Sequence, residues 1–179
     1  MKRYVALLRG INVGGNKKVE MKKLKSVFES LGFKNVSTYI NSGNVIFETE
    51  MKNDDDIVKV VGEKLSDVFG FEIRTLVRGA KDIERLVQAI PTDWTNDSKQ
   101  RTDVLFLWDT FDNKKSISLI KTTEGVDNLE YILGAIVWNV DKKLYSKSGM
   151  HKFIGTTVYK HMTARNVNTV RKLAELTAK

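Results

Sequence analysis

The chain has 179 residues, of which 41% are hydrophobic and 29% charged, a composition typical of a globular protein rather than a disordered one. It contains no cysteine, which excludes thiol catalysis, thiolate metal sites and disulfides and favours a reducing compartment. Residues 4–8 are too short an apolar run for a signal peptide, and no run of about 18 apolar residues could span a bilayer. We therefore expect a cytoplasmic protein with no membrane partner.

The net charge of +8 is unevenly distributed. Residues 1–40 hold nine Lys or Arg against two acids, residues 41–141 hold twelve against nineteen, and residues 142–179 hold nine against one. If the two basic ends meet in the fold, they form a positive region that attracts phosphate. Alternatively, the lysines are solvated helix faces and the basic ends attract the acidic middle.

The first half of the chain alternates strand and helix patterns. The predicted elements are a strand, a helix, two strands, a helix and a strand, over residues 4–9, 21–31, 36–40, 45–49, 57–68 and 73–77. Gly32 and Gly70 end the two helices, and the Asn-Ser-Gly-Asn segment 41–44 predicts a tight hairpin turn. This β-α-β-β-α-β order is the ferredoxin-like pattern.

The second half of the chain shows a similar order of strand and helix patterns. A short helix over 80–90 ends at Pro91, and a polar stretch, 92–102, is a candidate linker. The later predicted elements are a strand, a helix, a hairpin and two helical segments, over residues 104–108, 113–121, 127–140, 150–159 and 167–178. We therefore expect an α+β protein of two ferredoxin-like subdomains packed together, with an extra C-terminal helix. The expected divisions are an N-terminal subdomain, a connecting helix and linker, and a C-terminal subdomain, over residues 1–79, 80–102 and 103–179.

Two of the predicted strands are apolar at every position, residues 4–8 and 104–108. A strand buried on one face only would alternate with polar residues. Both sheets are therefore expected to be covered on two faces, and packing of the two halves against each other is the simplest cover.

The ferredoxin-like order brings several polar segments to one sheet edge. The third strand lies antiparallel between the first two, so the end of strand 4–9, the 41–44 turn and the start of helix 21–31 must meet. Glycines let backbone N–H groups approach a ligand, and a helix N-terminus favours an anion. The predicted ligand-binding residues at this edge are Arg9, Asn12, Gly14, Gly15, Lys17, Lys18, Ser42 and Asn44. The alternative is that the glycines only form turns.

The Thr-Ala-Arg-Asn segment 163–166 precedes the last predicted helix. Thr163 or Asn166 fits an N-cap, whereas Arg165 would oppose the helix dipole. Such a local conflict marks either a functional residue or an ion pair with the acidic middle. Arg165 and Asn166 therefore join the predicted ligand-binding residues.

Motifs for known chemistry are incomplete. The spacing of Gly10 and Gly15 resembles a phosphate-binding P-loop, but Asn16 occupies the lysine position. His151 and His161 fit no common metal-ligand spacing, and Ser42 does not lie in a serine-hydrolase motif. We therefore expect no metal and no cofactor, and the sequence leaves open whether the protein is an enzyme.

Three stretches carry a resemblance to a known family: Leu-Leu-Arg-Gly-Ile-Asn-Val-Gly-Gly at residues 7–15, Thr-Tyr-Ile-Asn-Ser-Gly-Asn at 38–44 and Thr-Ala-Arg-Asn at 163–166. On these, the sequence resembles the uncharacterised family called domain of unknown function 1697. Asn41 and Val167 stand where many relatives have glutamine and tryptophan. The resemblance implies two ferredoxin-like subdomains and brings no established reaction, cofactor or catalytic residue.

The leading functional hypothesis is a binding protein that holds a phosphate-bearing or other anionic ligand, including nucleic acid, at the edge formed by residues 9–18 and 41–44. One alternative is an enzyme that clamps an anionic substrate with Arg9, Lys17 and Arg165 and uses Ser42, Tyr39 or a histidine in chemistry. Another is a protein-interaction module, which would expose an apolar patch. The oligomeric state is left open.

Overall fold

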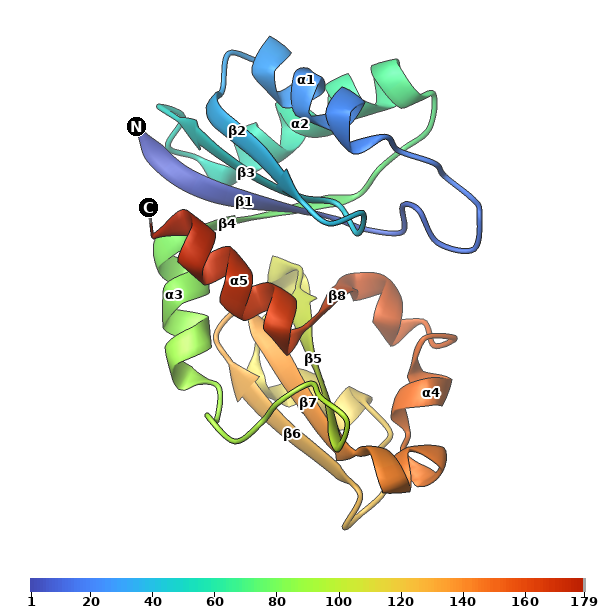
Figure 1. Cartoon of the computed structure of the whole chain (residues 1–179). Coiled ribbons are helices and arrows are strands. Elements are labelled where there is room, and N and C mark those ends of the chain that lie inside the picture. Colours follow the sequence, from blue (N-terminus) through green and yellow to red (C-terminus); the bar gives the residue numbers. More distant parts are fainter. Residues whose placement is uncertain (179) are drawn as a thin grey trace. The chain divides into compact units, whose positions relative to one another are not determined.

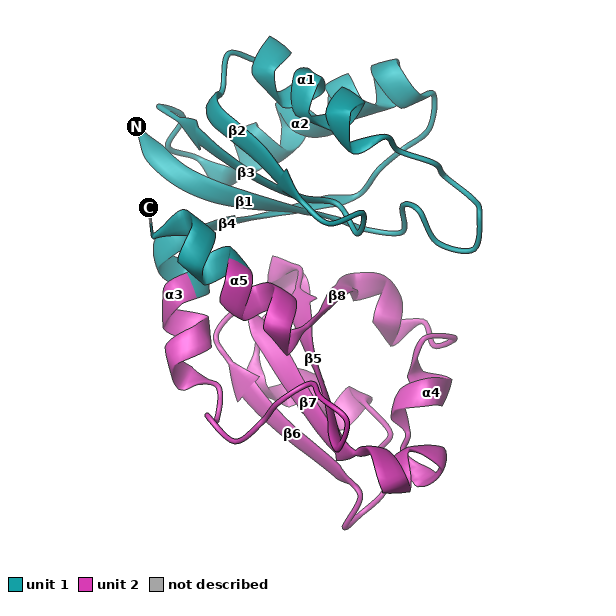
Figure 2. Cartoon of the chain, in the orientation of Figure 1, with its two compact units in different colours: residues 1–83, 173–179 teal, residues 84–172 magenta. Residues whose placement is uncertain are grey.

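Two four-stranded antiparallel sheets organise the protein, and each belongs to its own unit (Figure 2). The computed structural model describes residues 1–178. One unit comprises residues 1–83 and 173–179, and the other comprises residues 84–172. Both units have the strand order of a ferredoxin-like fold, so the expected α+β class is confirmed.

The first unit has the sheet order β2-β3-β1-β4, with α1 and α2 on one face (Figure 1). Its elements are β1 (Lys2–Leu8), α1 (Met21–Ser30), β2 (Lys34–Tyr39), β3 (Asn44–Thr49), α2 (Asp54–Phe69) and β4 (Thr75–Gly79). The core lies between this face and the helices, where the ring of Phe47 is 5.3 Å from that of Phe28 and 4.7 Å from that of Phe33.

Local sequence explains where the two helices lie. Leu24, Val27 and Phe28 form the buried stripe of α1. The side chain of Asn53 accepts the backbone N–H of Asp55 and caps α2, whose first turn is acidic. Gly70, with a φ of 78°, ends α2 in the left-handed conformation.

Both alternating sets of side chains in β1 are buried, because Ala6 is inaccessible to solvent and so are Val5 and Leu7. The same holds for β5 (Gln100–Leu107), in which Val104, Leu105 and the two residues after them are buried. The expected burial on two faces is therefore observed for these two central strands, β1 and β5.

The second unit repeats the topology of the first. Its sheet order, β6-β7-β5-β8, matches β2-β3-β1-β4 strand for strand. The remaining strands are β6 (Asp127–Ile132), β7 (Ala135–Asp141) and β8 (Met162–Asn166). The fourth strand of each sheet leads directly into a helix, α3 (Ala80–Ala89) after β4 and α5 (Val167–Thr177) after β8. The duplication inferred from element order is therefore confirmed.

Two predicted helices of this unit are largely wrong. The segment predicted over 113–121 is a 3-10 helix, η2 (Lys114–Leu119), preceded by the single 3-10 turn η1 (Asp109–Phe111). Serines and a β-branched residue fill its centre, and they disfavour an α-helix. The segment over 150–159 splits into α4 (Met150–Phe153) and the 3-10 turn η4 (Val158–His161). The Gly155-Thr-Thr segment between them explains the break.

The segment before α5 also differs from its predicted structure. Residues 162–166 form β8, a strand that the sequence analysis missed. Of the two predicted N-cap candidates, Asn166 caps α5, because its Oδ1 accepts the N–H of Thr169 at 3.0 Å, whereas Thr163 lies in the strand. Arg165, however, lies in the strand rather than in the first turn of the helix, so the supposed conflict with the helix dipole was wrong. The strand β5 also begins at Gln100, inside the predicted linker.

Candidate functional site

The predicted sheet edge exists in the first unit, and we call residues 9–18 and 41–44 the loop–turn site. The backbone N–H of Leu8 donates to the carbonyl of Gly43 at 2.8 Å, at the point where β1 ends. The side-chain Nδ2 of Asn12 donates to the carbonyl of Asn41 at 2.9 Å. The glycine-containing loop and the hairpin turn are therefore neighbours, as the topology predicted.

The side-chain amide of Asn12 holds the loop in place through both its nitrogen and its oxygen. Besides the bond to Asn41, its Nδ2 donates to the carbonyl of Val19 at 2.9 Å, and its Oδ1 accepts the N–H of Val19 at 2.8 Å. Its φ of 54° is left-handed, a region that asparagine tolerates better than most residues. Both donors of the amide are used on backbone carbonyls, those of Val19 and Asn41, so Asn12 shapes the site rather than offering donors to a ligand.

Gly14 and Gly15 form an exposed two-residue turn. The N–H of Asn16 donates to the carbonyl of Val13 at 3.1 Å, and the glycines have φ values of 59° and 78°. Positive φ at both central residues is typical of a type I′ turn and explains the glycine pair. Lys17 follows, and its Nζ lies 5.7 Å from the ring centroid of Phe71.

The hairpin turn is packed rather than open. Asn44 is fully buried, and its Nδ2 donates to the carbonyl of Tyr39 at 2.9 Å and to the Oγ of Ser42 at 3.0 Å. A Cβ on Gly43 would lie 2.7 Å from Cδ1 of Ile11, and the φ of Gly43 is 81°. Asn44 therefore supports the turn, and Gly43 is required by both space and conformation.

A shallow pocket of about 640 Å³ opens beside this loop, at the start of α1. Among the predicted ligand residues it is lined by Asn12, Gly15 and Lys18, and Lys22 and Asn41 contribute as well. The other predicted residues of this unit do not line it: Arg9, Gly14, Lys17, Ser42 and Asn44.

The N-terminus of α1 borders this pocket, and Glu20 at its N-cap is the one acid in the lining. The first turn of α1 contains no acid, and the side chain of Glu20 makes no capping bond. The first N–H groups of a helix lack intrahelical acceptors and carry partial positive charge. In α2 the same position is occupied by the Asn53 cap and three aspartates.

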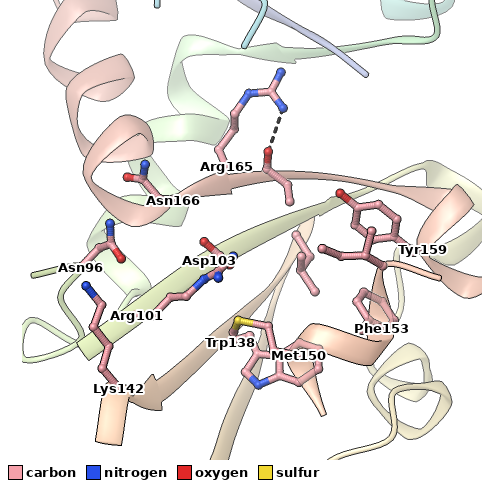
Figure 3. Close-up of a pocket in the computed structure, with 13 residues that line it drawn as sticks. Asn96, Arg101, Asp103, Trp138, Lys142, Met150, Phe153, Tyr159, Arg165 and Asn166 are labelled. Carbon is pink, nitrogen blue, oxygen red and sulfur yellow. Dashed lines mark hydrogen bonds and ion pairs between the residues drawn. The ribbon is translucent and has the colours of Figure 1, made fainter. Parts of the chain in front are cut away.

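Asn166 and Arg165 line a different pocket, of about 500 Å³, in the second unit (Figure 3). We call it the Asp103 pocket, and its lining includes the polar residues Asn96, Arg101, Asp103, Lys142 and Asn166 and the apolar or aromatic residues Trp138, Met150, Phe153 and Tyr159. Figure 3 shows the polar residues gathered at one end and Phe153 and Tyr159 at the other.

The guanidinium of Arg165 points away from Asp103 and its neighbours (Figure 3). Successive residues of a strand face opposite sides of the sheet, so Arg165 and Asn166 diverge. The Nη1 of Arg165 donates to Oγ1 of Thr163 at 3.1 Å and to the carbonyl of Ala164 at 2.8 Å. Burial lowers the pKa of Arg165 to about 10, which leaves it protonated at neutral pH.

Arg101 and Asp103 form an ion pair that the sequence analysis missed. Nε and Nη2 of Arg101 both lie 2.9 Å from Oδ2 of Asp103. Burial raises the pKa of Asp103, and Arg101 opposes that rise. The missed signal was the alternation of Arg101, Asp103 and Leu105, which places three side chains on one face of β5.

The histidines make ring contacts. His161 stacks on Phe111 with centroids 4.0 Å apart, and His151 lies edge-on to Tyr145 at 6.1 Å. Within residues 1–178, no group of three or more acidic or histidine side chains is placed to hold a metal ion. No helix in this part of the chain has the length and apolar character needed to cross a bilayer.

The two four-stranded sheets, each with the ferredoxin-like strand order, define the protein as an α+β protein of duplicated topology, and this fold does not by itself specify an activity. Residues 1–137 match the family described as "protein of unknown function (DUF1697)", so the chain belongs to this family. The match includes the loop–turn site and ends before Asn166. The chain is also similar to a solved structure, that of the conserved bacterial protein SP0830 from Streptococcus pneumoniae. The two are 29% identical over 98% of each chain, with a TM-score of 0.83. No curated protein matches the chain.

Proposed function

We propose that the protein binds a phosphate-bearing or other anionic ligand at the loop–turn site. The observation that carries this proposal is the N-terminus of α1, which has neither a side-chain cap nor an acid in its first turn. It borders a pocket in which Lys18 and Lys22 outweigh the single acid, Glu20. Oriented N–H groups and nearby ammonium groups together form a favourable environment for phosphate oxygens.

The rigidity of the site supports this function. The three hydrogen bonds of Asn12 fix the loop before any ligand arrives, which lowers the entropic cost of binding. Ile40, directly before Asn41, has a φ of 51°, which is strained for a β-branched residue. Strained backbone of this kind is concentrated at ligand sites.

Nucleic acid, if it is the ligand, binds through its phosphates in this proposal. Base stacking on the central strand of the first sheet is excluded, because the side chains of residues 4–8 are all buried. Contacts to phosphates release counterions, so affinity for an oligonucleotide must fall steeply with salt.

The test is a titration of the protein with pyrophosphate and with labelled single-stranded RNA and duplex DNA at several salt concentrations. The double variant Lys18→Gln/Lys22→Gln is expected to bind about tenfold more weakly or worse. The matched control, Lys34→Gln/Lys59→Gln, removes the same charge from exposed positions outside the pocket and should bind like the original protein. Equal weakening in both variants, or no binding of any probe at low salt, would overturn the proposal.

A further inference from the structure

The Asp103 pocket has an aromatic side. Trp138 of β7 is fully buried, and its ring centroid lies 5.4 Å from that of Phe153 in α4. Phe153 in turn lies 5.5 Å from Tyr159 in η4, in an edge-to-face arrangement. A flat ring that enters the pocket gains both apolar burial and edge or face contacts with these rings.

The polar end of the pocket combines residues from two neighbouring strands. Asp103 of β5 and Asn166 of β8 are directly paired in the sheet register. Paired residues project from the same face with Cβ atoms about 5 Å apart. Figure 3 shows both at the end of the pocket remote from Phe153 and Tyr159.

Each of these two side chains keeps one polar atom available. Nε and Nη2 of Arg101 contact Oδ2 of Asp103, and Nη1 donates to the hydroxyl of Tyr145. Within residues 1–178 no group donates to Oδ1 of Asp103. The Oδ1 of Asn166 is used to cap α5, whereas its Nδ2 has no acceptor among the described residues. The pocket thus presents an acceptor next to a donor.

We propose that the Asp103 pocket binds a nucleobase carried by a small molecule such as a nucleoside. Nucleobases combine a flat ring with an N–H donor and an acceptor on one edge, and this edge pairs with Oδ1 of Asp103 and Nδ2 of Asn166. The ring itself packs towards Phe153 and Tyr159.

The volume of the Asp103 pocket and the charges that line it fit an uncharged heterocyclic ligand. The pocket volume of about 500 Å³ lies within the range of small-molecule sites. Arg101 pairs with Asp103, and the ammonium group of Lys142 donates to the carbonyl of Asp97, so both cations at the polar end already contact protein groups. The residues all belong to the unit of residues 84–172, so this proposal is independent of the loop–turn site.

The test is NMR titration of the full chain, labelled with ¹⁵N, with adenosine, guanosine, cytidine and uridine separately. At least one nucleoside should shift the indole N–H signal of Trp138 and the side-chain amide signals of Asn166. The indole signal of Trp94, which does not line the pocket, should stay in place. If no nucleoside at millimolar concentration moves the first two signals, the proposal is wrong.

A conservative variant then tests the paired edge. Asn166→Ser keeps an oxygen able to cap α5 but removes the amide donor, so affinity should fall about tenfold while the melting temperature is retained. Asn128→Ser, on β6 and outside the pocket, should bind normally. Equal affinity of the two variants would overturn the pairing with Asn166.

The same pairing can be tested from the ligand side, by changing the edge of the nucleobase that faces Asp103. If adenosine binds, purine riboside, which lacks the exocyclic amino donor, should bind about tenfold more weakly; if guanosine binds, 1-methylguanosine, which lacks the ring N–H donor, is the corresponding probe. Indifference to the missing donor would contradict the role of Asp103 as acceptor.

Discussion

Gly43 lies directly against Leu8. The N–H of Leu8 donates to the carbonyl of Gly43 at 2.8 Å, and a Cβ added to Gly43 would approach Cβ of Leu8 to 2.8 Å. The hairpin turn therefore rests on the last residue of β1 with no space for a side chain. This contact places the turn beside the loop that follows β1.

Gly43→Ala should be strongly destabilising. The left-handed φ costs about 1–2 kcal/mol for alanine, and the overlap with Leu8 and Ile11 adds about 1–3 kcal/mol. Gly14→Ala is the matched control, since its φ is also positive but nothing lies within 4 Å of the added Cβ. Urea unfolding should show a clearly larger loss for Gly43→Ala, and equal losses would contradict the close packing.

Asn12→Gly should loosen the loop–turn site. Glycine accepts the φ of 54°, so this variant removes the amide without adding backbone strain. Loss of three partly exposed hydrogen bonds is expected to cost about 1–3 kcal/mol. Hydrogen exchange should detect faster exchange at the N–H of Val19, and unchanged protection there would show that the amide does not hold the loop.

Asp127 should make the protein sensitive to acid. Its carboxylate accepts the N–H groups of Thr123 at 2.7 Å and Gly149 at 2.9 Å, the indole N–H of Trp138 at 2.9 Å, and the hydroxyl of Ser148. Burial raises the pKa of Asp127, but these hydrogen bonds outweigh burial and hold the pKa below its usual 3.8. The carboxylate therefore stabilises the fold above about pH 4, and this contribution is lost as the pH falls through the lowered pKa.

Comparison with Asp127→Asn measures that contribution. At neutral pH the variant should be about 2 kcal/mol less stable, because the charge is lost and an amide N–H₂ faces other donors. The difference between the two proteins in urea midpoint should shrink as the pH is lowered from 5 towards 2, a range set by the direction of the shift. A difference that is constant with pH would contradict the assignment.

Asp97 should titrate near pH 2. The hydroxyl of Thr95 is the main cause of this lowered pKa, followed by the N–H groups of Gln100 and Lys99. Carboxyl-carbon NMR should give a pKa of about 2, and Thr95→Ala should raise the pKa towards 3.8. Thr92→Ala, which removes no hydrogen bond to this carboxylate, should leave the pKa unchanged. A pKa near 3.8 in the original protein would contradict the hydrogen-bonded turn.

Local patterns of apolar, polar and glycine residues were enough to predict the elements of the first unit. The buried stripe of α1 and the glycine at 70 are local signals, and each coincides with the observed helix. In the second unit, short 3-10 turns occupy parts of the two predicted helices, 113–121 and 150–159. Such turns are too short to show an apolar stripe in the sequence. The missed strand β8 is only five residues long and includes Arg165.

The order of elements also determined that the glycine-containing loop and the 41–44 turn are neighbours, because strand pairing in a ferredoxin-like unit leaves those ends at one sheet edge. Which groups there are available was decided only by the tertiary structure. Asn12 and Asn44 use their amide donors on carbonyls and a hydroxyl within 2.9–3.0 Å, partners that residue types alone do not reveal. Likewise, Asp103 and Asn166 are 63 positions apart, and cross-strand register alone sets them side by side.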